Sequence, residues 1–358
     1  MPTVQLPPEL WLLILPYTLT PYDPTTLLHL SLASPPLRAL LAWHEGSLVR
    51  QIRASAACPA RSADLFPDLP LKTFAGLDEL YKRQAVLQEL SERWPWIVAG
   101  GENGELGWLE GRWEGVFRAG ALLLYRLRDA GAAAVVLAGP VTSCLGQSPE
   151  DTKERAREFE QGRPSRERTF ATHDAQVRLL RSLPATSLAC LNFVLVAGFK
   201  ILRAHGLAPV NASRWTEDED RDMEARVGAA CKDVVLAQGV DGLLGLLGAG
   251  AGLYSEDWWV KGQMRAERAL GLLRARIAIS AERVPSTLMP SPQILSAVLR
   301  ASLAEKAGCG VRETEKRMWA ILSGTAVDGL GAGEEGQIKM GEVVRGEEMG
   351  RGMRRMGF

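Results

Sequence analysis

The first 45 residues combine an almost continuous apolar pattern with regularly placed helix-start signals. Residues 6–15, LPPELWLLIL, are apolar at nearly every position, and their two prolines suit the first positions of a helix, where a missing N–H costs nothing. Asp23 and Ser34 each precede a proline and a further apolar stretch, so both are expected N-caps. Pro16 indicates a helix end nearby. The pattern predicts three short helices, with breaks near residues 18–22 and at Ser34.

These three helices carry more hydrophobic surface than they can bury among themselves. Residues 1–42 contain thirteen leucines, besides Trp11, Ile14 and Tyr17. Each predicted helix has only two or three turns, and such small units bury a small fraction of their surface. Part of the apolar surface must therefore contact residues outside these three helices. The contact is made either by the rest of this chain or by a different protein, since a large exposed apolar patch usually marks an interface.

Beyond residue 50 the hydrophobic pattern is mostly that of helices. Apolar residues recur with helical spacing in three segments, residues 76–90, 262–280 and 291–308. Thr216–Glu219, TEDE, is a capping box that opens another helix. Residues 190–199, CLNFVLVAGF, lack clean periodicity and fit either a buried helix or a buried strand. No repeat of 20 to 50 residues is visible. We therefore predict a mainly α-helical chain, with an irregular helical region after the first three helices.

The end of the chain has a different composition. Residues 324–358 contain ten glycines and eleven charged residues, with Phe358 as their single aromatic residue. Such a segment cannot build a core, so we expect disorder. A dense run of mixed charges at residues 149–168 predicts an exposed helix followed by a flexible loop. The predicted domains are an N-terminal three-helix module (1–50), a helical region that binds a substrate or partner (51–324), and a disordered Gly-rich tail (325–358).

Charge and cysteine content narrow the function classes. Lys plus Arg equals Asp plus Glu, at 42 each, and no long basic block appears, so nothing favours a nucleic-acid partner. The five cysteines and four histidines are scattered, which argues against a disulfide framework or a metal site and fits a reducing compartment. No basic region precedes the apolar start, so we expect no signal peptide. Residues 185–199 are too few to span a membrane, and we expect them to be buried.

Three stretches resemble functional motifs without the context that those motifs need. Residues 331–336, GAGEEG, match a dinucleotide-binding glycine pattern, but no crossover unit follows them. Residues 218–222, DEDRD, have calcium-like spacing, but Met223 stands where the loop requires glycine. The four tryptophans of residues 94–113 fit either a recognition pocket or an irregular core segment, and we favour the core. We predict no catalytic residue, no cofactor and no metal site.

The start of the chain resembles the F-box, a three-helix module of similar length. The family pattern runs Leu-Pro-x-Glu-Leu, three spacers, Ile-Leu, then a Leu, an Asp and an apolar–small pair. The residues that match it are Leu6, Pro7, Glu9, Leu10, Ile14, Leu15, Leu19, Asp23, Leu30 and Ser31. Thr18 is one extra residue between the first two helices, and Pro24 stands where the family usually has an apolar residue. The resemblance covers residues 1–45.

The resemblance implies that this module docks onto the Skp-type linker of a cullin–RING ubiquitin ligase, while the rest of the chain captures a protein substrate. The residues expected to contact the linker are Leu6, Pro7, Glu9, Leu10, Ile14, Leu15, Leu19, Asp23, Leu27 and Leu30. The chain is then no enzyme, because it only raises the local concentration of a substrate near a ubiquitin-conjugating enzyme. The resemblance places it in the cytoplasm or nucleus, without a membrane partner. The alternative is a scaffold protein whose F-box acts without ubiquitin transfer.

Overall fold

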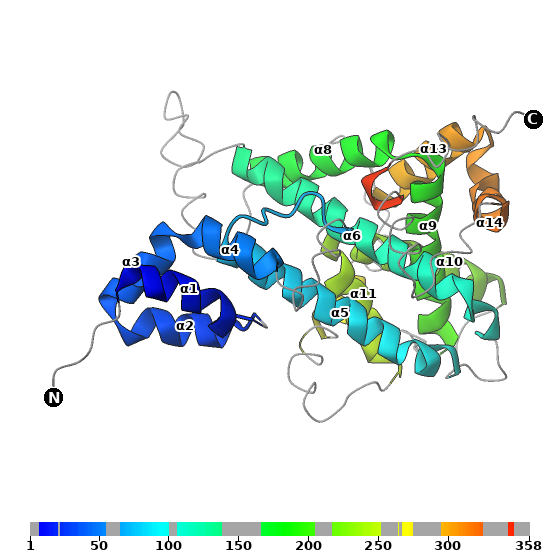
Figure 1. Ribbon diagram of the computed structural model, residues 1–358. Coiled ribbons are helices and arrows are strands. Elements are labelled where there is room, and N and C mark those ends of the chain that lie inside the picture. Colours follow the sequence, from blue (N-terminus) through cyan, green and yellow to red (C-terminus); the bar gives the residue numbers. More distant parts are fainter. Residues whose placement is uncertain are drawn as a thin grey trace, which may run out of the picture. The chain divides into compact units, whose positions relative to one another are not determined.

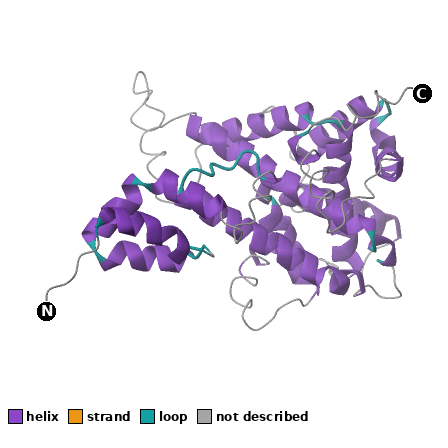
Figure 2. Ribbon diagram, viewed as in Figure 1, coloured by secondary structure: helices purple, strands orange, loops and turns teal. Residues whose placement is uncertain are grey.

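The computed structural model describes residues 7–20, 22–54, 65–99, 106–137, 166–204, 217–251, 264, 267–274, 295–324 and 343–346. Within these ranges the regular secondary structure is entirely helical, as Figure 1 and Figure 2 show. The prediction of a mainly α-helical chain is therefore confirmed. The chain divides into two compact units, residues 1–93 and 94–358, and the division falls within the long helix α5 (Phe74–Ala99).

The first unit contains α1 (Pro8–Thr18), α2 (Pro24–Ala33), α3 (Pro35–Trp43), α4 (Glu45–Ala54) and α5 up to Arg93. α1 packs on α4, and α3 packs on both α2 and α4. The core of these four helices consists of enclosed aliphatic side chains: Leu15, Leu19, Leu37, Leu41, Leu48, Val49 and Ile52. The predicted domain boundary at residue 50 lies inside α4, whose buried face is part of this core. The first compact unit is consequently longer than the predicted module.

The starts of α2 and α3 follow the predicted capping. The Asp23 carboxylate accepts hydrogen bonds from the backbone N–H groups of Thr25, at 3.1 Å, and Thr26, at 3.0 Å. The Ser34 hydroxyl accepts one from the backbone N–H of Leu37, at 3.2 Å. Each cap satisfies donors that the first turn of a helix leaves without an intrahelical partner. The predicted helix starts at these two positions are confirmed.

The connection after α1 is tied to the start of α5. α1 continues through Pro16, because a proline in the last turn removes only one intrahelical hydrogen bond. The helix then ends at Thr18. Beyond it, the Tyr22 hydroxyl donates to the carbonyl oxygen of Phe74 at 3.2 Å, and burial raises the pKa of Tyr22 to about 12. The Glu45 carboxylate accepts the Phe74 N–H at 2.7 Å. The predicted break near residues 18–22 is confirmed.

The second unit is built around α9 (Ala185–Ala204), whose residues 187–198 are all buried. The helices that pack on α9 are α6 (Arg112–Leu137), α10 (Glu217–Gln238), α11 (Val240–Ala251), α13 (Leu295–Ala307) and α14 (Thr314–Gly324). α8 (Arg166–Ser182) packs on α6 and α13, and two short 3-10 helices are η3 (Gly107–Leu109) and η6 (Val311–Glu313). Among the described helices, α9 alone is long and apolar enough to span a membrane, yet 78% of that window is buried in the fold. Residues 190–199 therefore form a buried helix.

The tryptophans of residues 94–113 lie in two environments. Trp94 is buried and packs on Phe117, with ring centroids 4.8 Å apart, so the predicted core role is confirmed for this residue. The side chain of Trp96 lies outside the described residues. Four aromatic rings form a second cluster at the edge of the core, in which only the phenylalanine is fully buried: Trp108, Trp113, Phe193 and Trp319.

Part of the C-terminal tail packs on helices of the second unit. Val343 and Val344, in the segment drawn red in Figure 1, are buried. The hydroxyl of Ser187 donates to the carbonyl of Val343, and the guanidinium of Arg126 donates to that of Val344. The prediction of disorder is wrong for residues 343–346, because two adjacent valines supply enough apolar surface for burial. The rest of the predicted tail lies outside the described residues.

The other predicted helices have described counterparts. Residues 76–90 lie in α5, residues 267–274 are helical, and α13 ends at Ala307, directly before Gly308, whose φ of +62° suits a helix end. The capping residue Thr216 precedes α10 and lies outside the described residues, as do the charged residues 149–165.

Candidate protein-interaction surface

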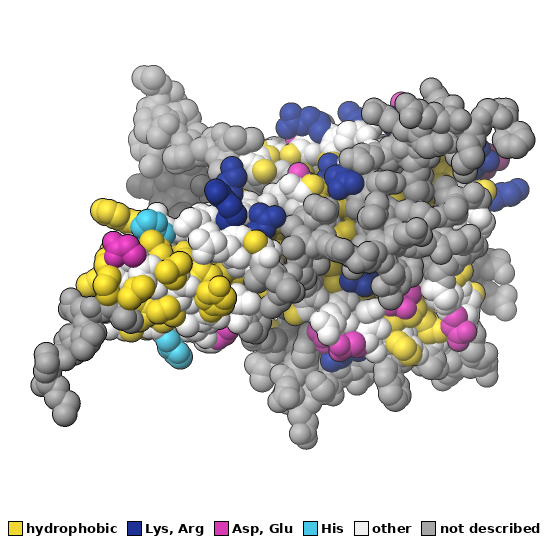
Figure 3. Space-filling model, viewed as in Figure 1, with side chains coloured by type: hydrophobic (Ala, Val, Ile, Leu, Met, Phe, Trp, Pro, Cys, Tyr) yellow, Lys and Arg dark blue, Asp and Glu magenta, His cyan; other side chains and the backbone are white. Residues whose placement is uncertain are grey.

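The first three helices expose large hydrophobic side chains. These are Leu10, Leu13, Ile14 and Tyr17 in α1, Leu28 and Leu32 in α2, and Trp43 in α3. We call this set the α1–α3 surface, and Figure 3 shows hydrophobic side chains gathered over this part of the first unit. Elsewhere in the described ranges, large exposed apolar side chains are isolated in sequence: Met264, Leu272 and Val311. Clustering, rather than exposure of any one side chain, distinguishes the α1–α3 surface.

α1 carries two apolar stripes that face in opposite directions. Leu10, Leu13, Ile14 and Tyr17 follow the spacing i, i+3, i+4, i+7, so they share one face of the helix. Leu13 is 65% exposed and Tyr17 is 82% exposed, so this face points to solvent. Leu15 lies on the other face, is 0% exposed and packs in the core. A helix of a soluble domain normally buries a stripe with this spacing. The outer stripe of α1 is thus only partly covered by its own unit.

α2 and α3 extend the apolar surface beyond α1. Leu28 and Leu32 are one helical turn apart in α2, and both are more than half exposed. α2 buries none of its residues fully. Trp43, in the last position of α3, is 87% exposed. Leucines flanked by an exposed Trp and an exposed Tyr give the composition of a protein interface, where aromatic side chains supply much of the binding energy.

Asp23 positions α2. One carboxylate oxygen accepts the N–H of Thr25, and the other accepts the hydroxyls of Thr25 and Thr26 and the N–H of Thr26. These bonds, first among them the one from the Thr25 hydroxyl, hold the pKa of the Asp23 carboxyl well below its usual range. Because both oxygens are used within the cap, Asp23 orients the helix that presents Leu28 and Leu32.

The structure separates the predicted contact residues into three groups. Those exposed are Pro7, Glu9, Leu10 and Ile14, and those half-buried are Asp23, Leu27 and Leu30. Leu6 lies outside the described residues. The prediction is corrected for Leu15 and Leu19, which are both 0% exposed. Their side chains stabilise the core of the first unit and do not reach its surface.

Sequence reasoning missed five members of the α1–α3 surface: Leu13, Tyr17, Leu28, Leu32 and Trp43. The helical spacing from Leu10 and Ile14 could have found Leu13 and Tyr17, since all four lie on one face. It could not have shown that this face points outward, because the opposite stripe is also apolar.

Neither a metal-binding cluster among the described residues nor a similarity to a known protein points to the function of this surface. Among the described residues, no three His, Cys, Asp or Glu side chains are grouped so as to hold a metal ion. Comparisons of the chain with protein-family models, curated proteins and solved structures give no significant match.

Proposed function

We propose that the chain is an F-box substrate adaptor, which docks through the α1–α3 surface onto the Skp-type linker of a cullin–RING ubiquitin ligase. The second unit, residues 94–358, recruits the protein to be ubiquitinated. The observation that carries this proposal is the solvent-facing stripe of α1, Leu10, Leu13, Ile14 and Tyr17. It lies within residues 1–45, through which the sequence resembles the F-box, and two of its four members, Leu10 and Ile14, belong to the family pattern.

The energetics favour an interface at this surface. Covering a fully exposed leucine contributes about 1.5–3 kcal/mol, and Leu13 is still 65% exposed in the isolated chain. Tyr17 and Trp43 add large rings with few rotatable bonds, so little entropy is lost when they are held in a complex. Association itself costs at least about 4 kcal/mol in lost freedom of motion. Seven large apolar side chains offer enough surface to exceed that cost.

The second unit suits the recruiting role because it has a core of its own around α9. It can hold a substrate while the first unit is engaged elsewhere. No chemical step is assigned to the chain, whose contribution is to keep a substrate lysine near the conjugating enzyme.

Co-purification with a Skp-type linker tests the proposal. In Leu13→Glu/Tyr17→Glu, each carboxylate would be enclosed without a partner, which costs about 3–5 kcal/mol per charge. Affinity should fall at least about a hundredfold. Both positions are exposed, so the variant should keep the helical circular dichroism and melting midpoint of the wild type. Val311→Glu, at an exposed apolar position of η6 in the second unit, is the matched control and should bind like the wild type.

Wild-type affinity of Leu13→Glu/Tyr17→Glu for the linker would refute the proposal that the α1–α3 surface is the docking site.

A second assay separates the adaptor from the scaffold alternative. The linker, cullin, RING protein and conjugating enzyme are combined with the chain and a protein captured by its second unit. Transfer of ubiquitin to the captured protein supports the adaptor, whereas linker binding without transfer supports the scaffold.

A further inference from the structure

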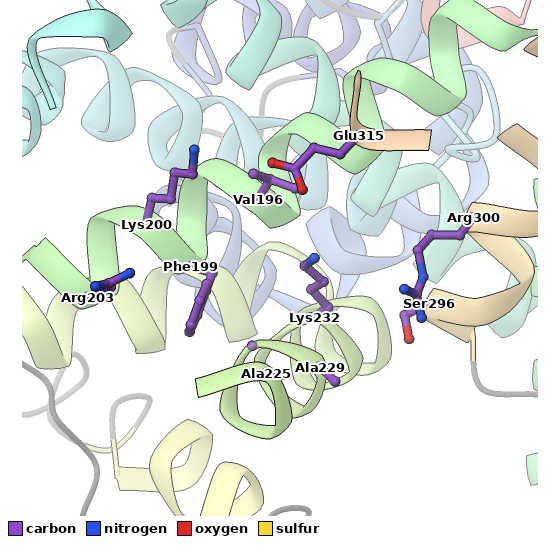
Figure 4. Close-up of a pocket in the computed structure, with 11 residues that line it drawn as sticks. Val196, Phe199, Lys200, Arg203, Ala225, Ala229, Lys232, Ser296, Arg300 and Glu315 are labelled. Atoms are coloured by element: carbon purple, nitrogen blue, oxygen red, sulfur yellow. The ribbon is translucent and has the colours of Figure 1, made fainter. Parts of the chain in front are cut away.

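A cavity of about 450 Å³ opens in the second unit between α9, α10, α13 and α14 (Figure 4). One side of its lining is apolar and comes from α9 and α10, with Val196, Phe199, Ala225, Gly228 and Ala229. The charged lining comes from all four helices: Lys200, Arg203, Lys232, Arg300 and Glu315. The volume lies within the range of about 300–1,000 Å³ typical of small-molecule sites, and such sites pair apolar walls with a few polar groups.

The charges of this cavity are unbalanced. Among the described residues that line it, and leaving Arg203 aside, three cationic side chains meet one carboxylate, in a chain whose net charge is zero. Low-dielectric walls concentrate the field of such a group and raise the local concentration of anions. The local charge therefore selects for a negatively charged ligand.

Lys232 is the central cation of the cavity. Figure 4 shows its side chain rising from α10 toward Val196 and Glu315, with Arg300 entering from α13 beside Ser296. Burial lowers the pKa of Lys232, the Arg300 charge lowers it further, and the Glu315 carboxylate opposes both. Within the described residues, Lys232 forms no ion pair. A partly buried ammonium in this position is costly unless an anion joins it.

Lys200 lies against two aromatic rings at the edge of the cavity. Its Nζ lies 5.2 Å from the ring centroid of Trp108 and 5.9 Å from that of Trp319. Cation–π contact with the two rings helps to hold this ammonium in position. The half-buried aromatic cluster thus helps to maintain the positive field.

We propose that this cavity binds a small organic anion, whose carboxylate or phosphate group contacts Lys232 and Arg300 while its apolar body lies on Val196, Phe199 and Ala229. A guanidinium and an ammonium together provide the donors that such oxygens require, and the arginine fork can bind two of them at once. The apolar wall sets a preference for an anion that carries a hydrophobic group over an inorganic ion. The inference concerns the second unit and does not depend on the proposed F-box function.

Calorimetric titration of the full-length chain tests this site. The probes are phenyl phosphate, benzoate and, as an uncharged match, benzyl alcohol. We expect saturable binding of at least one anion at a stoichiometry of one and no saturable binding of benzyl alcohol. The two anions distinguish a phosphate ligand from a carboxylate ligand.

Lys232→Met should weaken binding of the preferred anion at least about tenfold, because a charge-assisted contact is lost. Lys306→Met removes the same charge from an exposed position of α13 that does not line the cavity, and it should stay within about twofold of wild type, because solvent and salt screen an exposed charge. Arg300→Gln should also weaken binding of the preferred anion. Because Arg300 is exposed and lies on α13, this variant tests the site without disturbing the packing of α10.

A side-chain NMR titration gives an independent readout, with the Lys232 signal identified by its loss in Lys232→Met. Bound anion should raise the pKa of Lys232 relative to the ligand-free chain, since an opposite charge favours the protonated form. Three results would overturn the proposal: no saturable anion binding up to about 10 mM, unchanged affinity in both Lys232→Met and Arg300→Gln, or an unchanged pKa of Lys232.

Discussion

Leu15→Ala and Leu13→Ala should affect different properties of the chain, although both residues belong to α1. The first should change the stability of the first unit, and the second should change its affinity for the linker. Leu15 is 0% exposed and supports the core, whereas Leu13 is 65% exposed and belongs to the α1–α3 surface. Leu15→Ala should therefore lower the stability of the first unit with little direct effect on the linker contact. Leu13→Ala should weaken linker binding and leave the stability unchanged.

The magnitudes follow from the exposures. Truncating a buried leucine to alanine costs about 2–5 kcal/mol, whereas an exposed substitution usually changes stability by less than about 0.5 kcal/mol. A unit of 93 residues has a stability of roughly 5–14 kcal/mol, so Leu15→Ala removes a large part of it. At about 4–8 °C per kcal/mol for a domain of this size, its melting midpoint should fall by at least about 8 °C.

Two assays on the full-length chain decide the matter. Differential scanning calorimetry compares the melting midpoints of wild type, Leu13→Ala and Leu15→Ala, and calorimetric titration measures linker affinity well below those midpoints. Equal destabilisation by the two variants would refute the assignment of an inner and an outer stripe. So would a Leu13→Ala variant that binds the linker as tightly as the wild type while Leu15→Ala does not.

Three further predictions concern other parts of the chain. Deleting the residues after Gly324 should destabilise the second unit by more than about 1 kcal/mol, because the buried Val344 is removed; an unchanged midpoint in thermal melting would refute this packing. Asp23→Asn should keep the α2 cap but lose its pH dependence. Since the pKa of Asp23 is lowered in the fold, its extra stabilisation is present above the unfolded pKa of about 3.9 and disappears as the pH falls below it, which melts of both proteins at a series of pH values will show. Iodoacetamide should alkylate Cys309 before Cys190, because burial shields Cys190 and raises its pKa to about 12; equal rates in timed mass spectrometry would contradict this.

Local features of the first unit could be predicted from the sequence. Asp23 and Ser34 cap helices by accepting hydrogen bonds from N–H groups only two or three positions away, so residue type and spacing identify them. The breaks between the helices follow from the same local chemistry. The orientation of α1 could not be predicted in this way, because Leu13 and Leu15 are the same residue type and only packing on α4 decides which is buried.

Contacts between residues far apart in the sequence could not be predicted from local patterns. The composition of the tail indicated disorder, but Val344 accepts a hydrogen bond from Arg126, 218 positions earlier, and this partner cannot be read from spacing. The charged cavity could not be predicted from local sequence patterns either. Lys232 and Arg300 lie on different helices, and neither belongs to a motif in the sequence. Their proximity depends on how α10 and α13 pack against each other.

Hydroxyl-radical footprinting of the full-length chain, with and without a saturating Skp-type linker, tests the proposed docking most directly. Tyr17 and Trp43 are 82% and 87% exposed, so both side chains should be readily oxidised in the free chain. We predict that the linker suppresses oxidation of both, while Met264, an exposed residue of the second unit, remains as reactive as before. Unchanged oxidation of Tyr17 and Trp43 in the presence of the linker would contradict the proposal that the α1–α3 surface is the docking site.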